Sequence, residues 1–189
     1  MKKTVALVLV LVMAATLAVG CGKKKDKTEA PSVESPLVLL EQVWGKYAEE
    51  DKFFARGGDF SEENMKENAP GKYALTDAEA VNAELGLPVG RVSVVTDAAS
   101  LIHGMNANTF TCGAFRLKDS KDAAALVPAL KESIQGRNWI CGTPETLLIA
   151  TLGDHVVAVF GNDQLVQTFK TNLQAAYASV KIDVQEAIV

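Results

Sequence analysis

The spacing of hydrophobic residues divides the chain into segments of helical and of extended character. Apolar residues recur at helical spacing behind Ser35, Thr76, Asp119 and Asn162, and each of these four can accept a hydrogen bond from the first turn of a helix. The expected helices run over 36–51, 76–85, 120–135 and 163–179. Pro128 lies inside the third of them, where an interior proline predicts a kink.

Other stretches are short, rich in β-branched or aromatic residues and bounded by turn residues, which is typical of strands. The expected strands run over 91–95, 109–117, 146–152 and 155–161. Gly153-Asp154, between the last two, predicts a tight hairpin. We expect a brief helix over 98–102 and a loop with room for one helical turn over 59–72. The segment 180–184 fits either an edge strand or a tail.

The order of these elements predicts the fold class. Two helices come first, followed by a strand, a helix, a hairpin and a last helix, and the hairpin is incompatible with a purely parallel sheet. We expect an α+β fold, with an antiparallel or mixed sheet of about four strands and helices packed on one face. The segment 37–189 is long enough for a single domain with a full core, and its best-defined module is 75–178.

The first twenty residues have the layout of a secretory signal. Lys2-Lys3 give a positive start, an apolar run broken by one threonine extends from Val5 to Val19, and Cys21 follows Gly20. This arrangement resembles the bacterial lipoprotein signal, although Ala18 stands where a Leu-like residue is usual. The resemblance implies cleavage before Cys21 and attachment of lipid to its thiol.

The alternative is a retained transmembrane helix in which Cys21 has no role. A membrane span needs about 20 apolar residues, and this run is shorter than that before Gly22 and the lysines at 23–25. A retained span would also carry those lysines across the membrane, against the usual distribution of positive charge. We therefore expect a lipidated Cys21, a flexible tether over 21–36 and a body held at the extracytoplasmic face of the cell membrane.

The charge balance argues against one class of partner. Without Lys2 and Lys3, the 19 basic residues fall to 17 against 23 acidic residues, a net charge of −6. An acidic body is a poor match for nucleic acid, because phosphate binding needs clustered cations. The basic cluster at 23–27 lies beside Cys21, where it would meet anionic lipid head groups or serve as a solvated linker.

Cys112 and Cys141 are the cysteines that follow Cys21. An exported protein occupies a compartment in which disulfides persist, and a pair with no odd member is compatible with one bridge. Such a bridge would close a loop of about 30 residues and stabilise the fold by roughly 3.6 kcal/mol through lost chain entropy in the unfolded state. The alternative is two buried free thiols.

A cysteine nucleophile would need a histidine within hydrogen-bond reach. The candidates are Cys112 or Cys141 with His103 or His155, but no local motif suggests the required geometry, so we do not expect an enzyme. Two distant histidines without paired cysteine or carboxylate spacing predict no metal site. We also expect no cofactor, because the glycines lack the strand-to-helix context of a phosphate-binding loop.

Asn106 and Asn108 flank Ala107 in an expected loop, and Trp139 stands two residues before Cys141. The two amides could hydrogen-bond a ligand while the indole offers a stacking face. The alternative is a structural role, in which asparagines in a turn satisfy their own backbone and the tryptophan packs inside. Asn106, Asn108 and Trp139 are therefore the candidate ligand contacts.

Three segments of the chain together carry a resemblance to a known family. They are Met105-Asn106-Ala107-Asn108-Thr109-Phe110-Thr111, Trp139-Ile140-Cys141-Gly142 and the strand end Phe160-Gly161. Together they resemble a family of small bacterial lipoproteins whose shared domain has no assigned function, over about residues 75–178. The resemblance implies an extracytoplasmic lipoprotein with a compact α+β domain, and it supplies no catalytic residues.

The sequence as a whole predicts a lipid-anchored lipoprotein that acts outside the cytoplasm as a non-catalytic binding or interaction module. Its expected partners are the membrane, through the lipid on Cys21, and either an envelope protein or a small ligand. The alternative is a small cell-envelope enzyme that uses a cysteine nucleophile.

Overall fold

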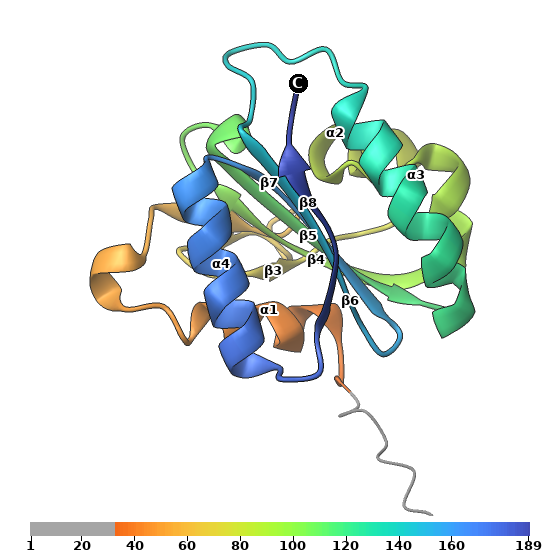
Figure 1. Cartoon of the computed structure of the whole chain (residues 1–189), viewed down its shortest axis with the longest axis horizontal. Coiled ribbons are helices and arrows are strands. Elements are labelled where there is room, and N and C mark those ends of the chain that lie inside the picture. Colours follow the sequence, from red (N-terminus) through yellow and green to blue (C-terminus); the bar gives the residue numbers. More distant parts are fainter. Residues whose placement is uncertain (1–32) are drawn as a thin grey trace, which may run out of the picture.

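One antiparallel sheet forms the centre of the structure, a computed structural model that describes residues 33–189 (Figure 1). Its strands are β1 (Ala55–Gly57), β2 (Lys66–Glu67), β3 (Gly71–Lys72), β4 (Val95–His103), β5 (Phe110–Leu117), β6 (Thr146–Leu152), β7 (His155–Gly161) and β8 (Lys181–Ala187). They pair in the order β2-β1-β4-β5-β7-β6-β8, and β3 pairs with β4 off this path. The expected antiparallel sheet is confirmed, but it has eight strands rather than about four.

Helices cover both faces of this sheet. They are α1 (Pro36–Trp44), α2 (Ala78–Leu85), α3 (Ala123–Gln135) and α4 (Asp163–Ala176). Figure 1 shows α1 and α4 on one face and α2 and α3 on the other. The prediction of helices on one face is wrong because the central strands are apolar on both sides. Along β5, Cys112 and Ala114 pack in the core under α1 and α4, while Phe115 packs in the core under α2 and α3.

The helices begin at polar residues close to those expected from the sequence. The side chains of Ser35, Asp77 and Asn162 each accept a hydrogen bond from a backbone N–H in the first turn of α1, α2 and α4. Asp77 rather than Thr76 therefore caps α2. Gly86 ends this helix with a φ of 80°, a left-handed conformation that glycine adopts without a Cβ clash. α3 contains Pro128 in its interior, and the kink there stays a prediction.

Short 3-10 helices fill several connections. They are η1 (Glu49–Asp51), η2 (Val89–Val94), η3 (Ala107–Thr109) and η4 (Ser120–Asp122). α1 ends at Trp44, short of the expected 51, and η1 forms after a separate turn. The expected strand at 91–95 is mostly η2.

The second half of the chain follows the sequence pattern closely. The strands expected over 109–117, 146–152 and 155–161 are confirmed as β5, β6 and β7, and the β6–β7 hairpin turns at Gly153-Asp154. β8 pairs with β6 at the edge of the sheet, so the segment after α4 is an edge strand and not a tail.

Two segments of the first half were predicted wrongly. The residues 98–102 belong to β4, not to a helix, because Ala98 and Ala99 face opposite cores and the strand is held by pairs on both sides. The segment 59–72, expected as a loop, contains β2 and β3.

The domain begins before the expected boundary at residue 37. Val33 is buried in the core beside α1, and Pro36 is the first residue of that helix. The signal segment 1–20, Cys21 and the remainder of the predicted tether lie outside the described residues. Among residues 33–189, none of the helices combines the length and the apolar character that a membrane crossing needs.

Candidate functional site

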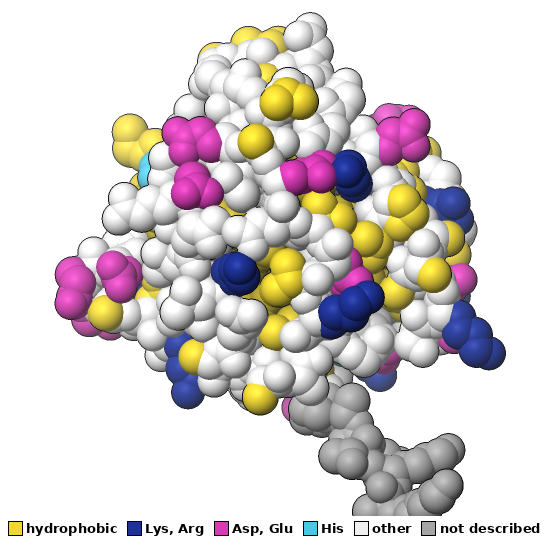
Figure 2. Space-filling model, viewed as in Figure 1, with side chains coloured by type: hydrophobic (Ala, Val, Ile, Leu, Met, Phe, Trp, Pro, Cys, Tyr) yellow, Lys and Arg dark blue, Asp and Glu magenta, His cyan; other side chains and the backbone are white. Residues whose placement is uncertain are grey.

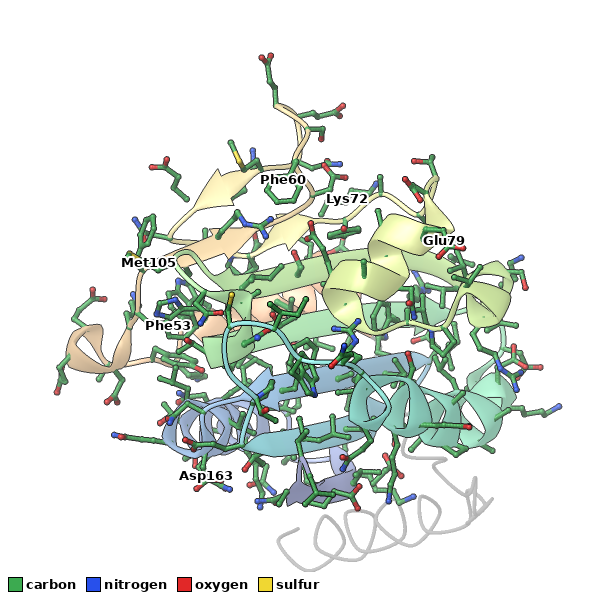
Figure 3. The ribbon with its side chains drawn as sticks, turned by 90° about the horizontal axis from the view of Figure 1, so that it is seen from above. Phe53, Phe60, Lys72, Glu79, Met105 and Asp163 are labelled. Carbon is green, nitrogen blue, oxygen red and sulfur yellow. The ribbon has the colours of Figure 1, made fainter. Side chains whose placement is uncertain are left out.

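The loops at one end of the sheet hold the candidate ligand contacts. At this end β5 begins and β7 ends, with Phe110 paired to Gly161. At the opposite end, Arg116 donates a hydrogen bond to the carbonyl of Glu34, close to where the described chain begins. We call the loops 104–109 and 136–145 the distal end, because Figure 1 shows them opposite that entry point, and Figure 3 looks down on them.

Asn106 and Asn108 fasten the loop between α3 and β6. Nδ2 of Asn108 donates to the carbonyls of Ile140 at 2.7 Å and Gly142 at 2.6 Å, and Nδ2 of Asn106 donates to the carbonyl of Cys141 at 3.3 Å. Oδ1 of Asn106 accepts from the backbone N–H of Asn108 at 3.0 Å. The predicted residues do meet in space, but their amide hydrogens serve the structural role that was the alternative. We call residues 139–142 the clamped loop.

Trp139 packs partly within the protein, and it also lines a hollow together with Asn82 and Asn108. Its ring centroid lies 5.3 Å from that of Phe160, and the guanidinium of Arg137 lies 5.4 Å from the indole centroid. Nε1 of Trp139 is buried and has no hydrogen-bond partner among residues 33–189. The indole N–H is therefore an unused donor at the distal end.

A hollow of about 440 Å³ lies beside the clamped loop. Asn106, Asn108 and Cys141 line one side of it, and Glu145 and Asn162 line the other. Cys141 is exposed there and has a φ of 67°, a left-handed conformation that is uncommon for a residue with a side chain. The carbonyls on either side of it are the ones that Asn108 holds, so the clamp stabilises this conformation.

Cys112 and Cys141 are both free thiols, and the predicted disulfide is not formed. Cys112 is buried in the middle of β5, facing the core under α1 and α4, whereas Cys141 is exposed in the clamped loop. Burial raises the pKa of the Cys112 thiol well above its ordinary value, which is the opposite of what a nucleophile needs.

The two histidines lie apart from these thiols. Nδ1 of His103 accepts from the backbone N–H groups of Met105 and Asn106, and its ring stacks on Phe53 with centroids 5.5 Å apart. His155 is buried at the start of β7, at the opposite end of the sheet. Among residues 33–189, no hydrogen bond joins a cysteine thiol to an imidazole, so the geometry of a cysteine nucleophile with its base is not assembled.

A second cavity, of about 250 Å³, lies between α2, β1 and the turn after α3. Arg56, Glu84 and Arg137 supply its charged groups, and Phe60 and Phe160 supply most of its apolar wall. Asn108 also lines it, so the cavity adjoins the clamped loop. We call it the arginine cavity. Figure 3 shows Phe60 and Met105 on the rim of the distal end, on the side of β1.

The two arginines of the arginine cavity differ in their charge partners. Nη2 of Arg56 lies 3.6 Å from Oε2 of Glu84, and the guanidinium lies 4.3 Å from the ring centroid of Phe60. Burial raises the pKa of Glu84, and the charge of Arg56 opposes the shift without cancelling it. Burial also raises the pKa of Tyr73, and the nearby charge of Glu84 adds to that rise. Arg56 is thus paired with an acid.

Arg137 has no such partner. Within residues 33–189 no carboxylate lies within ion-pair distance of it. Its Nη2 donates to the carbonyl of Asn82 in α2, and its guanidinium lies over the rings of Trp139 and Phe160. Burial lowers the pKa of Arg137, as expected for a cation removed from water without a counter-charge.

The sequence did not reveal this cavity. Arg56, Glu84 and Arg137 come from β1, from α2 and from the turn after α3, and no spacing relates them. One signal was available, an arginine two residues before the candidate Trp139, but a single basic residue in a loop is ordinary.

The basic side chains on one face of the protein are scattered, and the potential metal ligands of the described residues are scattered as well. On the face shown in Figure 2, lysine and arginine side chains lie apart from one another and among acidic ones, without the basic patch that binds nucleic acid. Among the described residues, no three histidine, cysteine or acidic side chains gather closely enough to hold a metal ion.

Comparison of the chain with protein-family models, with curated proteins and with solved structures finds no match. The resemblance to small bacterial lipoproteins therefore stays a prediction from the sequence segments that carry it.

Proposed function

We propose that this protein is a non-catalytic binding module, fastened by a lipid on Cys21 to the extracytoplasmic face of the cell membrane. The observation that carries the proposal is the position of two hollows beside the candidate contacts. The hollow beside the clamped loop and the arginine cavity both lie toward the distal end, away from the entry of the chain at Val33, whereas a further hollow of about 510 Å³ adjoins Val33 itself. A tether at Val33 would leave that end free to meet a partner.

Exposed apolar side chains at the distal end support recognition there. Met105 is 82% exposed, Ile140 is 76% exposed and Phe54 is 52% exposed. Phe54 lies against Gly104, whose backbone N–H donates to the Phe54 carbonyl at 2.8 Å, so it adjoins Met105. Grouped apolar side chains on a water-exposed surface mark interaction sites. An envelope protein or a small ligand is the expected partner.

The placement of the cysteines favours binding over catalysis. Cys112 is sealed in a core, and Cys141 has no imidazole hydrogen-bonded to its thiol among the described residues. An enzyme built on either thiol would need a base from a partner or from a different conformation. The proposal therefore assigns the distal end to recognition.

The anchor is tested by replacing Cys21 with Ala in the full chain, with Cys141→Ala as the matched control. Two or more acyl chains hold a protein firmly to a bilayer, since each buried methylene contributes about 0.8 kcal/mol. We expect the wild type and the control to remain with membranes and to carry acyl mass on the first residue. A mature wild-type chain that begins at Met1 without acyl mass would refute the anchor.

Recognition at the distal end is tested by placing a photoreactive amino acid at Met105 or, as a control, at Lys118. Both side chains are exposed, but Lys118 follows β5 at the opposite end of the sheet. After illumination of intact cells, intact-mass measurement of the recovered lipoprotein detects an adduct of any size. We expect a discrete adduct from Met105 and not from Lys118. Equal adducts at the two positions, or none at Met105, would contradict the proposal.

A further inference from the structure

Arg137 combines three properties that ordinary surface arginines lack. It is half-buried, it has no carboxylate partner among residues 33–189, and it lines a partly open cavity together with a second arginine. Removing a guanidinium from water without a counter-charge is costly, and proteins usually offset that cost with an acid. Here the guanidinium contacts no acid of the described residues; it contacts the carbonyl of Asn82 and the rings of Trp139 and Phe160 instead.

The charge of the arginine cavity favours one negative group. Arg56 and Glu84 neutralise each other at 3.6 Å, which leaves the charge of Arg137 uncompensated. A guanidinium matches a carboxylate or a phosphate through two parallel hydrogen bonds. A monoanion would therefore complete the electrostatics of the cavity, whereas a dianion would exceed its charge.

The walls and the size of the cavity favour an organic body on that anion. Phe60, Phe160 and Ile102 line it together with Ala83 and Ala107. Its volume of about 250 Å³ lies just below the range of about 300–1,000 Å³ that drug-sized ligands occupy. A small acid with an apolar or aromatic body fits this space, while a bare inorganic anion would leave the apolar wall uncovered.

Glu84 adds a requirement for a hydrogen-bond donor. Its Oε2 is buried and makes no hydrogen bond of good geometry among the described residues, because Nη2 of Arg56 lies 3.6 Å away, and Tyr73 is its other close polar neighbour. A buried acceptor that lacks a hydrogen bond of good geometry favours a ligand that donates one. Arg137 is bonded to Asn82, two residues before Glu84 in α2, so the two groups border the same small space. A ligand that carries a hydroxyl beside its carboxylate could therefore reach Glu84 and Arg137 together.

We propose that the arginine cavity binds a small organic carboxylate with an apolar body and a neighbouring hydroxyl group. Arg137 pairs the carboxylate, Phe60 and Phe160 hold the body, and Glu84 accepts the hydrogen of the neighbouring group. This assignment rests on the proposed function as a binding module and deepens it by naming the chemical class of the ligand.

The test uses the lipidated chain purified in detergent and four probes that differ in the chemical groups they carry. Mandelate carries all three features, phenylacetate lacks the hydroxyl, benzyl alcohol lacks the carboxylate, and inorganic phosphate lacks the apolar body. The readout is tryptophan fluorescence, because the indole of Trp139 lies 5.4 Å from the guanidinium of Arg137. We expect saturable binding of mandelate, at least about threefold weaker binding of phenylacetate, and none of the other two.

Variants of the protein then test the roles of Arg137 and Glu84. Arg137→Gln should weaken mandelate binding at least about tenfold, since a charge-assisted hydrogen bond is lost. Arg91→Gln makes the same charge change at an exposed position of η2 and should leave binding within about twofold. Glu84→Gln should remove the advantage of mandelate over phenylacetate. Circular dichroism of each variant checks folding, and Arg137→Lys, which keeps the charge, should retain weak binding if the glutamine variant is unfolded.

The outcomes separate the proposals. No saturable change with mandelate, equal binding of phosphate, or an equal loss in the Arg91 and Arg137 variants would overturn the carboxylate site. The photoadduct at Met105 tests whether the distal end contacts a partner, and it does so independently of this ligand. If mandelate fails while that adduct forms, the cavity assignment alone is wrong, and if both fail, the binding module itself is refuted.

Discussion

The side-chain amide of Asn108 holds the carbonyl of Ile140 at 2.7 Å across a gap of 32 positions in the chain. The same nitrogen holds the carbonyl of Gly142 at 2.6 Å, so one side chain bridges both sides of Cys141. The short helix η3 before β5 and the loop before β6 are thereby joined by one side chain.

Replacing Asn108 with Ala should loosen the clamped loop. Two hydrogen bonds are lost at about 0.5–1.5 kcal/mol each, so we expect the free energy of unfolding to fall by about 1–3 kcal/mol. Hydrogen exchange should speed up over 139–143 and remain unchanged in β6 and β7. Mass spectrometry after deuterium labelling measures both regions in one experiment.

Asn138→Ala is the matched control for that change. Asn138 is exposed one residue before the clamped loop, and no hydrogen bond of its side chain is found among the described residues. We expect its stability and exchange to match the wild type. A similar loss in both variants would mean that the loop is held by general packing and not by the amide of Asn108.

The thiols provide a second prediction. In the folded protein an alkylating reagent should modify Cys141 and leave Cys112 untouched, because Cys112 is fully buried and its pKa is raised by burial. Peptide mapping should find Cys112 modified only after denaturation. A Cys141→Ser variant should therefore show no modification past Cys21 in its folded state. Failure of both thiols to react after denaturation without reductant would instead indicate a disulfide.

The sequence allowed the fold to be predicted best where each element carries its own signals. β6 and β7 are continuous apolar runs separated by Gly153-Asp154, and α4 follows Asn162 directly, so local information sufficed. β2 and β3 have two residues each and cannot display an alternating pattern. Their pairing is decided by the partner strands β1 and β4, which no local window includes.

The candidate site was predictable to a similar extent. Asn106, Asn108 and Trp139 do come together at the distal end. The asparagine amides, however, hydrogen-bond the clamped loop, and the indole packs on Phe160. The arginine cavity depends on contacts between β1, α2 and the turn after α3. Arg56 and Arg137 look like solvated residues in the sequence, because half-burial arises from the tertiary packing of other elements around them.

Asp59 organises the loop after β1, and its removal gives a third prediction. Its carboxylate accepts hydrogen bonds from the backbone N–H groups of Ser61 and Ala74, both at 2.9 Å, and from Nδ2 of Asn64 at 2.8 Å. Burial acts to raise the pKa of Asp59, but the hydrogen bonds from Ser61, Asn64 and Ala74 outweigh it and lower the pKa to about 2. Asp59→Asn should destabilise the protein by about 1–2 kcal/mol at neutral pH.

The destabilisation by Asp59→Asn should depend on pH. A carboxyl whose pKa is lower in the folded state stabilises the fold above its ordinary pKa of 3.8 and loses this contribution as the pH falls toward 2. Urea unfolding should therefore show the difference between Asp59→Asn and wild type shrinking below pH 4. Glu62→Gln, an exposed neighbour in the same loop, should behave like wild type throughout. A constant difference at every pH would show that the loss comes from packing and not from charge.

His155 predicts a loss of stability in mild acid. It is fully buried at the start of β7, where Nδ1 lies 2.8 Å from Oδ1 of Asp154 but outside the angles of a good hydrogen bond. Burial lowers the pKa of His155, and the attraction of Asp154 is too weak to restore it. The unfolded imidazole binds a proton below its ordinary pKa of 6.5, whereas the folded one does not until a lower pH. The free energy of unfolding should therefore fall as the pH drops below 6.5, by at most about 1.4 kcal/mol per pH unit.

Chemical denaturation between pH 7.5 and pH 5 measures this slope above the range in which carboxylates titrate. His155→Leu removes the titrating group from a buried position and should flatten the curve. His103→Asn serves as the comparison, since burial also lowers the pKa of the half-buried His103 and its share of the slope has the same sign. A slope that persists in the doubly substituted protein would assign the acid sensitivity to groups other than the histidines. A slope that disappears with His155→Leu alone would assign it to the imidazole buried beside Asp154.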